Sequence, residues 1–177
     1  MDFEQLYQQA CIQQTDIHEH LPVLSDLASQ CSHVTELGVG TAQSTRAFLR
    51  HDIEIHSYEY APLPGIEDFF KQCKESGRNV TLHIADTRSI TIDPTDMLFV
   101  DSLHSYDQVF TELTLHAPQV RKFIGFHDTT LFEFRDEFDP NGRGIWPAIE
   151  DYMKSHPEWE FVERRTNNNG LTIYKRV

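Results

Sequence analysis

The sequence predicts an α/β fold built on a doubly wound, mainly parallel sheet with helices on both faces. Two observations lead to this prediction. From residue 33 onward, short β-type runs alternate with segments of helical character, which is typical of strand–helix–strand units. Near the end of the chain, residues 167–170 read Asn-Asn-Asn-Gly between two further β-type runs, and such a sequence favours a hairpin. The sheet is therefore expected to finish with an antiparallel pair.

The elements follow in order along the chain. Two helical segments come first, at 3–14 and 22–30, and Pro22 suits the first position of the second. The parallel strands are expected at 33–39, 53–59, 80–85, 96–101 and 122–127. Helical segments lie between most of them, at 43–51, 65–76 and 105–117. A helix at 146–156 then precedes the two final strands, at 160–166 and 170–177.

The length and composition indicate one domain over residues 1–177, with N-terminal helices at 1–31 and an α/β core at 32–177. Fifteen basic and 28 acidic residues give a net charge of −13, which argues against binding to nucleic acid or to an anionic membrane. The sequence shows no signal peptide and no membrane span, and its three cysteines fit no zinc spacing. A cytoplasmic protein is expected, with a small-molecule partner and no particular oligomeric state indicated.

An acidic residue lies at the carboxyl end of each predicted parallel strand. In order along the chain, these acids are Glu36, Glu59, Asp86, Asp101 and Asp128. Ligands of doubly wound sheets bind at this edge. The acids therefore predict a ligand that carries positive charge or hydroxyl groups rather than phosphate.

The first of these ends has the sequence ELGVGTAQST, residues 36–45. It lacks the lysine of a phosphate-binding loop, and Gln43 stands where a dinucleotide motif has its third glycine. S-adenosylmethionine (SAM) suits it better, because Glu36 could balance the positive end of this ligand. Gly38 and Gly40 would let the backbone approach, and Thr41 could cap the next helix. A plain strand–turn–helix corner is the alternative for this motif alone.

The next two strand ends complete a predicted nucleoside site. Glu59 lies 21 positions after Gly38, where a carboxylate can accept both ribose hydroxyls. Asp86, with Thr87 beside it, could receive the adenine amino group, and Tyr60 could pack on the face of the ring.

Five segments in this order resemble the class I SAM-dependent methyltransferases. More narrowly, they resemble the small-molecule O-methyltransferases related to macrocin O-methyltransferase and to cephalosporin-hydroxylase-like proteins. The matching segments are DIHEHLPVLSDLA (16–28), ELGVGTAQSTRAFL (36–49), FVDSLHSYDQVFTEL (99–113), IGFHDTT (124–130) and GIWPAIEDY (144–152). The resemblance implies a Rossmann-like, seven-stranded sheet with a reversed last strand and SAM as cofactor. It also implies that Ser44 and Asp101 contact SAM, and that the methyl acceptor is a sugar or polyketide-type hydroxyl.

A second group of residues lies at two neighbouring strand ends and could bind a divalent metal: Asp101, His104, His127 and Asp128. The resemblance implies Mg²⁺ on Asp101, His127 and Asp128, where it would acidify the acceptor hydroxyl. The sequence departs from the family at Leu103, which replaces an aspartate that acts as general base in some relatives. His104 is the best substitute, so His104 and Asp101 are the predicted catalytic residues.

Two other functions stay open at this stage. The group around Asp101 could serve a metal-dependent oxidoreductase or hydrolase that does not use SAM. Alternatively, Leu103 is compatible with a non-catalytic SAM-binding module. The segment 129–145, which contains three phenylalanines, is either a loop that covers a ligand or a connection whose aromatic side chains pack on the core.

Overall fold

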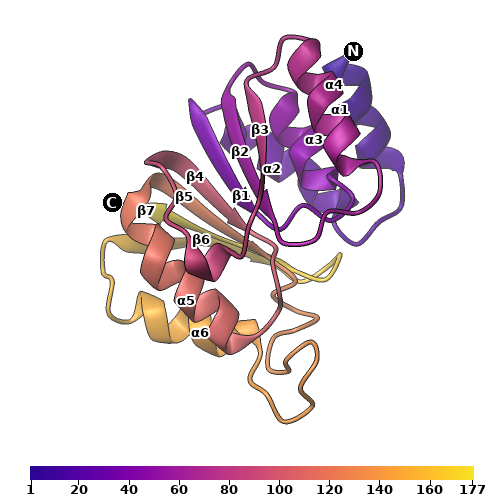
Figure 1. Cartoon of the computed structure of the whole chain (residues 1–177). Helices are drawn as coiled ribbons and strands as arrows, with labels where there is room; N and C mark the ends of the chain where they lie inside the picture. The colour runs from indigo at the N-terminus through magenta and orange to yellow at the C-terminus, as the bar shows by residue number, and fades with distance from the viewer.

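Seven strands form one sheet in the computed structural model, which describes residues 1–177 (Figure 1). The strands are β1 (His33–Leu37), β2 (Glu54–Glu59), β3 (Val80–Ile84), β4 (Thr95–Val100), β5 (Val120–His127), β6 (Trp159–Arg165) and β7 (Leu171–Arg176). The helices are α1 (Phe3–Ile12), α2 (Leu21–Ala28), α3 (Gln43–Leu49), α4 (Ile66–Glu75), α5 (Tyr106–His116) and α6 (Ile145–Met153). Three short 3₁₀ helices complete the fold: η1 (His18–His20), η2 (Thr87–Ser89) and η3 (Ala117–Gln119).

The strand order is β3-β2-β1-β4-β5-β7-β6. The first five of these strands are parallel to one another, and β7 pairs antiparallel with both β5 and β6. The predicted α/β class and the reversed last strand are confirmed. The order changes direction between β1 and β4, and in such sheets this switch point is where ligands bind.

Helices cover the two faces of the sheet unequally. Helices α1 to α4 pack on one face, around side chains such as Val34, Ile55 and Phe99. Helices α5 and α6 pack on the other face, against Leu37, Leu98 and neighbouring apolar residues (Figure 1). This division follows the alternation of side chains along a strand, which sends Val34 and Leu37 to opposite faces.

The connection from β3 to β4 contains only the short helix η2. The face that carries α5 and α6 therefore has no helix of its own over β2 and β3, and segment 88–94 covers part of it through the buried Ile92. The three cysteines are unpaired. None of the helices has the length and apolar character needed to cross a bilayer.

Candidate functional site

A cavity of about 560 Å³ opens at the carboxyl ends of the central strands. Its size falls within the usual range for small-molecule sites, about 300–1,000 Å³. Eight of the residues predicted from the sequence line it: Gly38, Gly40, Glu59, Tyr60, Asp86, Thr87, Asp101 and His104. Strand ends far apart in the sequence thus converge on one hollow, as the doubly wound sheet requires.

Gly38 brings the loop after β1 against the end of β4. Its φ is +85°, and a Cβ atom built on it would lie 2.0 Å from the carbonyl oxygen of Asp101. Only glycine fits there, because both the backbone conformation and the space exclude a side chain. Gly40 also has a positive φ, +48°, but a Cβ on it would meet nothing within 4 Å. Gly38 is therefore required by packing, whereas Gly40 leaves the cavity wall open.

Glu59 joins the end of β2 to the glycine loop. Its Oε2 accepts hydrogen bonds from the backbone N–H of Val39 at 3.0 Å and of Gly40 at 3.2 Å. Its Oε1 accepts from the backbone N–H of Ala61 at 3.1 Å. These three hydrogen bonds use both lone pairs of Oε2 and one of Oε1, so one lone pair of Oε1 remains. Glu59 can therefore hold the loop and still accept a hydroxyl from a ligand in the cavity.

The carboxylate of Asp86 is less available to a ligand than the sequence suggests. Its carboxylate caps η2 through the backbone N–H of Arg88 at 2.9 Å, and it also pairs with the Arg88 guanidinium at 2.9 Å. These hydrogen bonds lower the pKa of Asp86. An adenine amino group at this position would share the carboxylate with Arg88, which itself lines the cavity. Tyr60 lies at the rim and is 75% exposed.

A buried polar network under the cavity was missed by the sequence argument. Glu112 of α5 is fully buried and accepts hydrogen bonds from the hydroxyls of Thr87 at 2.5 Å and Ser102 at 2.8 Å. The Gln108 amide also donates to it at 2.8 Å. Burial raises the pKa of Glu112. The available signal was the Gln108–Glu112 pair, four residues apart on a predicted helix.

Glu36 does not line the cavity, contrary to the prediction that it balances the positive end of a ligand. It is 0% exposed, and its carboxylate accepts from the hydroxyls of Ser44 at 2.5 Å, Thr45 at 2.8 Å and Ser57 at 2.6 Å. Burial raises the pKa of Glu36 to about 7, although the three hydroxyls act in the opposite direction. Glu36 therefore fastens the first turn of α3 to β1 and β2.

Thr41 does not cap the following helix, which corrects a second prediction. Helix α3 begins at Gln43, and Ala42 precedes it in the left-handed conformation with φ of 59° and no side-chain cap. Thr41 is exposed, and its carbonyl accepts from Arg46. The side chain of Ala42 is fully buried, so packing imposes this turn on a residue that does not favour it.

Four residues form an acidic and imidazole cluster beside the cavity: Asp101, His104, His127 and Asp128. Nε2 of His104 lies 2.8 Å from Oδ2 of Asp128 and 3.5 Å from Oδ1 of Asp101. Nδ1 of His127 lies 3.3 Å from Oδ1 of Asp101 and 3.4 Å from Oδ2 of Asp128. The other nitrogens of the two rings face Glu137 at 2.9 Å and the carbonyl of Asn168 at 3.1 Å.

The charges of this cluster oppose the predicted role of His104 as a general base. Burial alone lowers the pKa of a histidine, but the two aspartates outweigh it and raise the pKa of His104 and of His127 to about 10. The histidines in turn hold the pKa of Asp128 well below its usual range, against the effect of burial. His104 is thus an imidazolium at neutral pH in this arrangement, and an imidazolium has no lone pair to accept a proton.

The same cluster has the donor atoms of a metal site. Asp101, His104 and Asp128 each offer one ligand atom, and these atoms lie within 4.8 Å of one another. Nε2 of His104 and Oδ1 of Asp128 are buried without a well-aligned hydrogen bond, although Nε2 is within ion-pair distance of the aspartates. Imidazole and carboxylate ligands suit a borderline divalent ion, whereas Mg²⁺ prefers oxygen ligands. The set therefore differs from the predicted one, Mg²⁺ on Asp101, His127 and Asp128, both in the ion it suits and in having His104 in place of His127.

A second cavity, of about 390 Å³, adjoins the first and shares Gly40, Asp101 and His104 with it. Thr41, Ser44 and Asp128 also line it, together with residues 15–17 from the N-terminal part of the chain. The shared wall brings the glycine loop and the acidic cluster together. Two ligands in the two cavities would therefore meet at Asp101 and His104.

The loop between β5 and α6 borders the first cavity. Phe132 stacks on the ring of His104 with centroids 4.6 Å apart and planes 9° apart. Glu137 and Phe138 line the cavity, and Phe138 is 78% exposed. These contacts favour the sequence interpretation that this loop covers a ligand, over that of a connection packed on the core.

No protein-family model matches the sequence, and no curated protein does. Solved structures do resemble it. The 1,6-didemethyltoxoflavin-N1-methyltransferase of Burkholderia thailandensis, with its substrate and S-adenosylhomocysteine bound, has a TM-score of 0.68 at 10% identity, over 93% of this chain and 80% of that one. The N-methyltransferase NodS of Bradyrhizobium japonicum WM9, in complex with S-adenosylhomocysteine, has a TM-score of 0.67 at 13% identity, over 99% of both chains.

An O-methyltransferase family protein of Burkholderia thailandensis has a TM-score of 0.60 at 14% identity, over 90% of this chain and 55% of that one. These three likenesses, all at low identity, show that the chain has the fold of the class I SAM-dependent methyltransferases. The resemblance drawn from the sequence is confirmed at this level. The neighbours include N- as well as O-methyltransferases, so they do not distinguish between the two acceptor atoms.

Proposed function

We propose that this protein is a SAM-dependent methyltransferase that transfers the methyl group to a hydroxyl of a small molecule. The observation that carries the proposal is the pair of adjoining cavities at the switch point of the sheet, which meet at Gly40, Asp101 and His104. The fold supports it, because the neighbours with this fold bind S-adenosylhomocysteine. The three unpaired cysteines fit the expected cytoplasmic location.

The larger cavity would take the adenosyl part of SAM. Glu59 would accept a ribose hydroxyl on Oε1, and Asp86 and Tyr60 would contact adenine from the rim. The residues of this set fit the ligand, because they present a carboxylate, an open glycine and no lysine. The methionine part would pass Gly40 into the second cavity, which has Thr41 and Ser44 on its wall.

The acceptor would enter the second cavity on the side of residues 15–17 and the acidic cluster. SAM would supply the methyl group: the acceptor oxygen would bond to the methyl carbon as its bond to sulfur breaks, and the hydroxyl proton would pass to solvent. Asp101 lines both cavities and would accept the hydrogen bond from that hydroxyl. Most of the rate enhancement would come from holding the two reactants in line.

The acidic cluster would hold a divalent ion of borderline softness on Asp101, His104 and Asp128. Such an ion acidifies a bound hydroxyl. Methyl transfer by protein dialysed against EDTA tests this part: recovery with Mn²⁺, Co²⁺ or Zn²⁺ is expected, and full activity of the metal-free protein would contradict it.

Isothermal titration with S-adenosylhomocysteine tests the cofactor. The wild-type protein should bind it, and Glu59→Gln should weaken binding by roughly 10–100-fold, because a hydrogen bond to a charged group contributes about 1.5–3 kcal/mol. Glu160→Gln is the matched control, since Glu160 lies on β6 and pairs only with Lys175 at the surface. Absence of binding, or equal affinity in both variants, would refute the assignment.

Transfer of a labelled methyl group from SAM tests the reaction. A panel of sugars and polyketide-type alcohols, each with its amine counterpart, should give label in the hydroxyl series only. Label in the amines would contradict O-methylation. Binding of SAM with no transfer to any acceptor would instead identify a non-catalytic module, and turnover without SAM would identify a metal-dependent hydrolase or oxidoreductase.

A further inference from the structure

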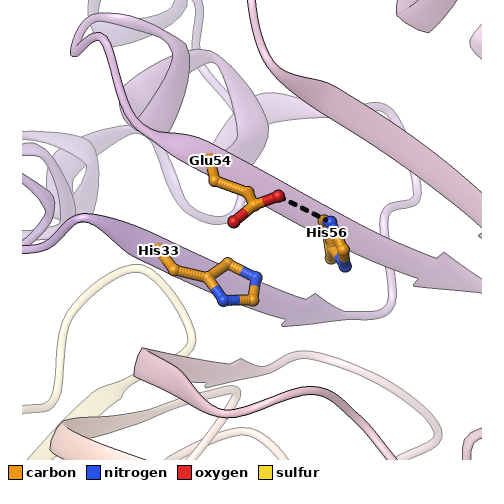
Figure 2. Close-up of side chains that lie close together, drawn as sticks. All are labelled: His33, Glu54 and His56. Carbon is orange, nitrogen blue, oxygen red and sulfur yellow. Dashed lines mark ion pairs between the residues drawn. The ribbon is translucent and has the colours of Figure 1, made fainter.

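Three side chains at the amino-terminal ends of β1 and β2 form a second cluster, far along the strands from the cavities. His33 is the first residue of β1 and pairs in register with Glu54, the first residue of β2. His56 lies two positions after Glu54, so all three side chains share one face of the sheet. Figure 2 shows the three side chains gathered together, with an ion pair between the carboxylate of Glu54 and the ring of His56.

The nitrogens of these rings are available as ligands. Nδ1 of His33 contacts the carbonyl of Pro94 at 3.0 Å, so in the neutral ring Nδ1 carries the proton and Nε2 has a free lone pair. Nε2 of His33 is buried with no hydrogen-bond partner, and Nε2 of His56 makes only a 3.4 Å contact with Glu54. His33 is only 6% exposed, and an unpaired polar atom in such a place is costly. An imidazole whose other nitrogen is fixed by a carbonyl is the usual arrangement of a metal ligand.

The distances also suit a small cation. His33, Glu54 and His56 each offer one ligand atom, and these atoms lie within 4.8 Å of one another. Oε1 of Glu54 and Nε2 of His56 are 3.4 Å apart, which is long for an ion pair that is also hydrogen-bonded (Figure 2). Two ligands of one tetrahedral zinc ion lie about 3.3 Å apart, given bonds of about 2.0–2.1 Å.

We propose that His33, Glu54 and His56 bind a borderline divalent transition-metal ion, of which Zn²⁺ is the representative. Two imidazoles and one carboxylate are a common donor set for zinc. The ion has a way in, because the side chain of Glu54 is 43% exposed and no helix covers β2 and β3 on this face. The ring of His83 on β3 is the next along the face, with its centroid 5.1 Å from that of His56.

The site serves structure rather than methyl transfer, because it lies at the opposite ends of the strands from the cavities. A bound ion would link β1 to β2, and through His33 it would also fix the Pro94 segment that leads into β4. Binding to the folded state alone stabilises it by mass action. The melting temperature should therefore rise when Zn²⁺ is added.

The test measures zinc itself, in wild type, in Glu54→Gln and in His56→Gln, by elemental analysis after equilibrium dialysis and by titration calorimetry. Each variant should bind one equivalent fewer than wild type, or bind that equivalent at least tenfold more weakly, since even outer-shell changes cost about 10–100-fold. His156→Gln, three residues after the end of α6, is the histidine control and should keep the wild-type value. Glu54→Gln is partly exposed and nearly isosteric, so it keeps the test valid if His56→Gln fails to fold.

Two further measurements separate this site from the cluster around Asp101. The Asp101→Asn variant should still bind the equivalent of zinc that the Glu54→Gln variant loses. With Cu²⁺ bound to the Asp101→Asn protein, the electron paramagnetic resonance spectrum should show two imidazole nitrogens, and one after His56→Gln is added. The proposal fails if wild type binds no zinc, if both variants bind it as tightly as wild type, or if Asp101→Asn removes all of it.

Discussion

Glu36 lies in a motif that suggests contact with a ligand, yet its carboxylate binds only hydroxyls of the protein. Three hydroxyls surround it, and one of them, Ser57, comes from the neighbouring strand β2. The strand position of Glu36 was predictable from the apolar run before it. Its partners were not, because they depend on which strands lie side by side. In contrast, Glu59 and Asp101 were predictable cavity residues, because both stand where a parallel strand ends.

The pH dependence of stability provides a test at this residue. The pKa of Glu36 is about 7 in the folded protein, against 4.5 for an ordinary glutamate. A raised pKa means that this group stabilises the fold fully below pH 4.5, and that the contribution is lost as the pH rises towards 7. Relative to Glu36→Gln, the wild type should lose about 1.4 kcal/mol of unfolding free energy per pH unit in this window, or roughly 3 kcal/mol in all.

Urea unfolding of both proteins between pH 5.5 and 8 measures the difference. The two plots of unfolding free energy against pH should converge or cross as the pH rises to about 7. Above that pH they should run in parallel. Glu160→Gln, an exposed control, should follow the wild type throughout. Parallel curves for Glu36→Gln and wild type below pH 7 would show that the carboxyl of Glu36 has an ordinary pKa and is already ionised in the folded protein over this range.

Gly38 and Gly40, in the loop after β1, should respond differently to substitution by alanine. Gly38→Ala would place a Cβ 2.0 Å from a backbone oxygen, whereas Gly40→Ala would meet no atom. Both changes carry the cost of a positive φ, about 1–2 kcal/mol, but only the first forces β1 and β4 apart. Thermal melts should show a small loss for Gly40→Ala, of roughly 2–8 °C, and a much larger one for Gly38→Ala. Equal losses would contradict the packing argument.

At the scale of elements, all six α-helices and all seven strands were predicted to within a few residues, whereas the three 3₁₀ helices were not. Apolar runs bounded by glycine, proline or polar residues mark the strands, and these signals are local. The start of α3 at Gln43 was predicted, but the way the chain enters the helix was not, because the left-handed Ala42 is imposed by burial and no residue in the motif indicates it. The hydrogen-bond network around Glu112 was not predicted for a similar reason, since Thr87 and Ser102 reach its carboxylate from other elements.

Asp96, the second residue of β4, connects three strands at their amino-terminal ends. It accepts hydrogen bonds from the backbone N–H and the hydroxyl of Ser32, at 2.7 and 2.8 Å, just before β1. It also pairs with Arg121 at 3.1 Å and Lys122 at 3.4 Å on β5. Burial alone would raise the pKa of Asp96, but these partners lower it to about 2.

Asp96→Asn should therefore destabilise the fold by roughly 2 kcal/mol at neutral pH. Because the pKa of Asp96 is depressed, this contribution is present above pH 3.8 and is lost as the pH falls towards 2. Urea unfolding at pH 7 measures the loss. Asp151→Asn, which changes an exposed carboxylate that pairs with Arg143 and Lys154 and accepts from the Tyr106 hydroxyl, should cost clearly less. Equal losses of unfolding free energy in the two variants would contradict the role of Asp96 in connecting the three strands.

At the scale of the whole molecule, the terminal hairpin completes the core as well as the sheet. Ile173 of β7 is 1% exposed and packs in the same apolar cluster as Met97 and Phe99 of β4. Ile173→Ala should cost about 2–5 kcal/mol in denaturant unfolding, because it leaves a cavity. Phe161→Ala on the adjacent β6 removes a side chain that is 51% exposed and should cost clearly less. A larger loss of stability in Phe161→Ala than in Ile173→Ala would show that the hairpin does not contribute to the core.

The open strands at the two ends of the sheet have a consequence for how copies of the protein meet. The outer strands are β3 and β6, and each exposes apolar side chains, Ile84 on the first and Phe161 and Val162 on the second. Unpaired edges of this kind can join edge to edge. At neutral pH a net charge of −13 keeps the molecules apart. Near the isoelectric point of 5.1 that repulsion disappears, so light scattering should show reversible self-association with a maximum close to pH 5.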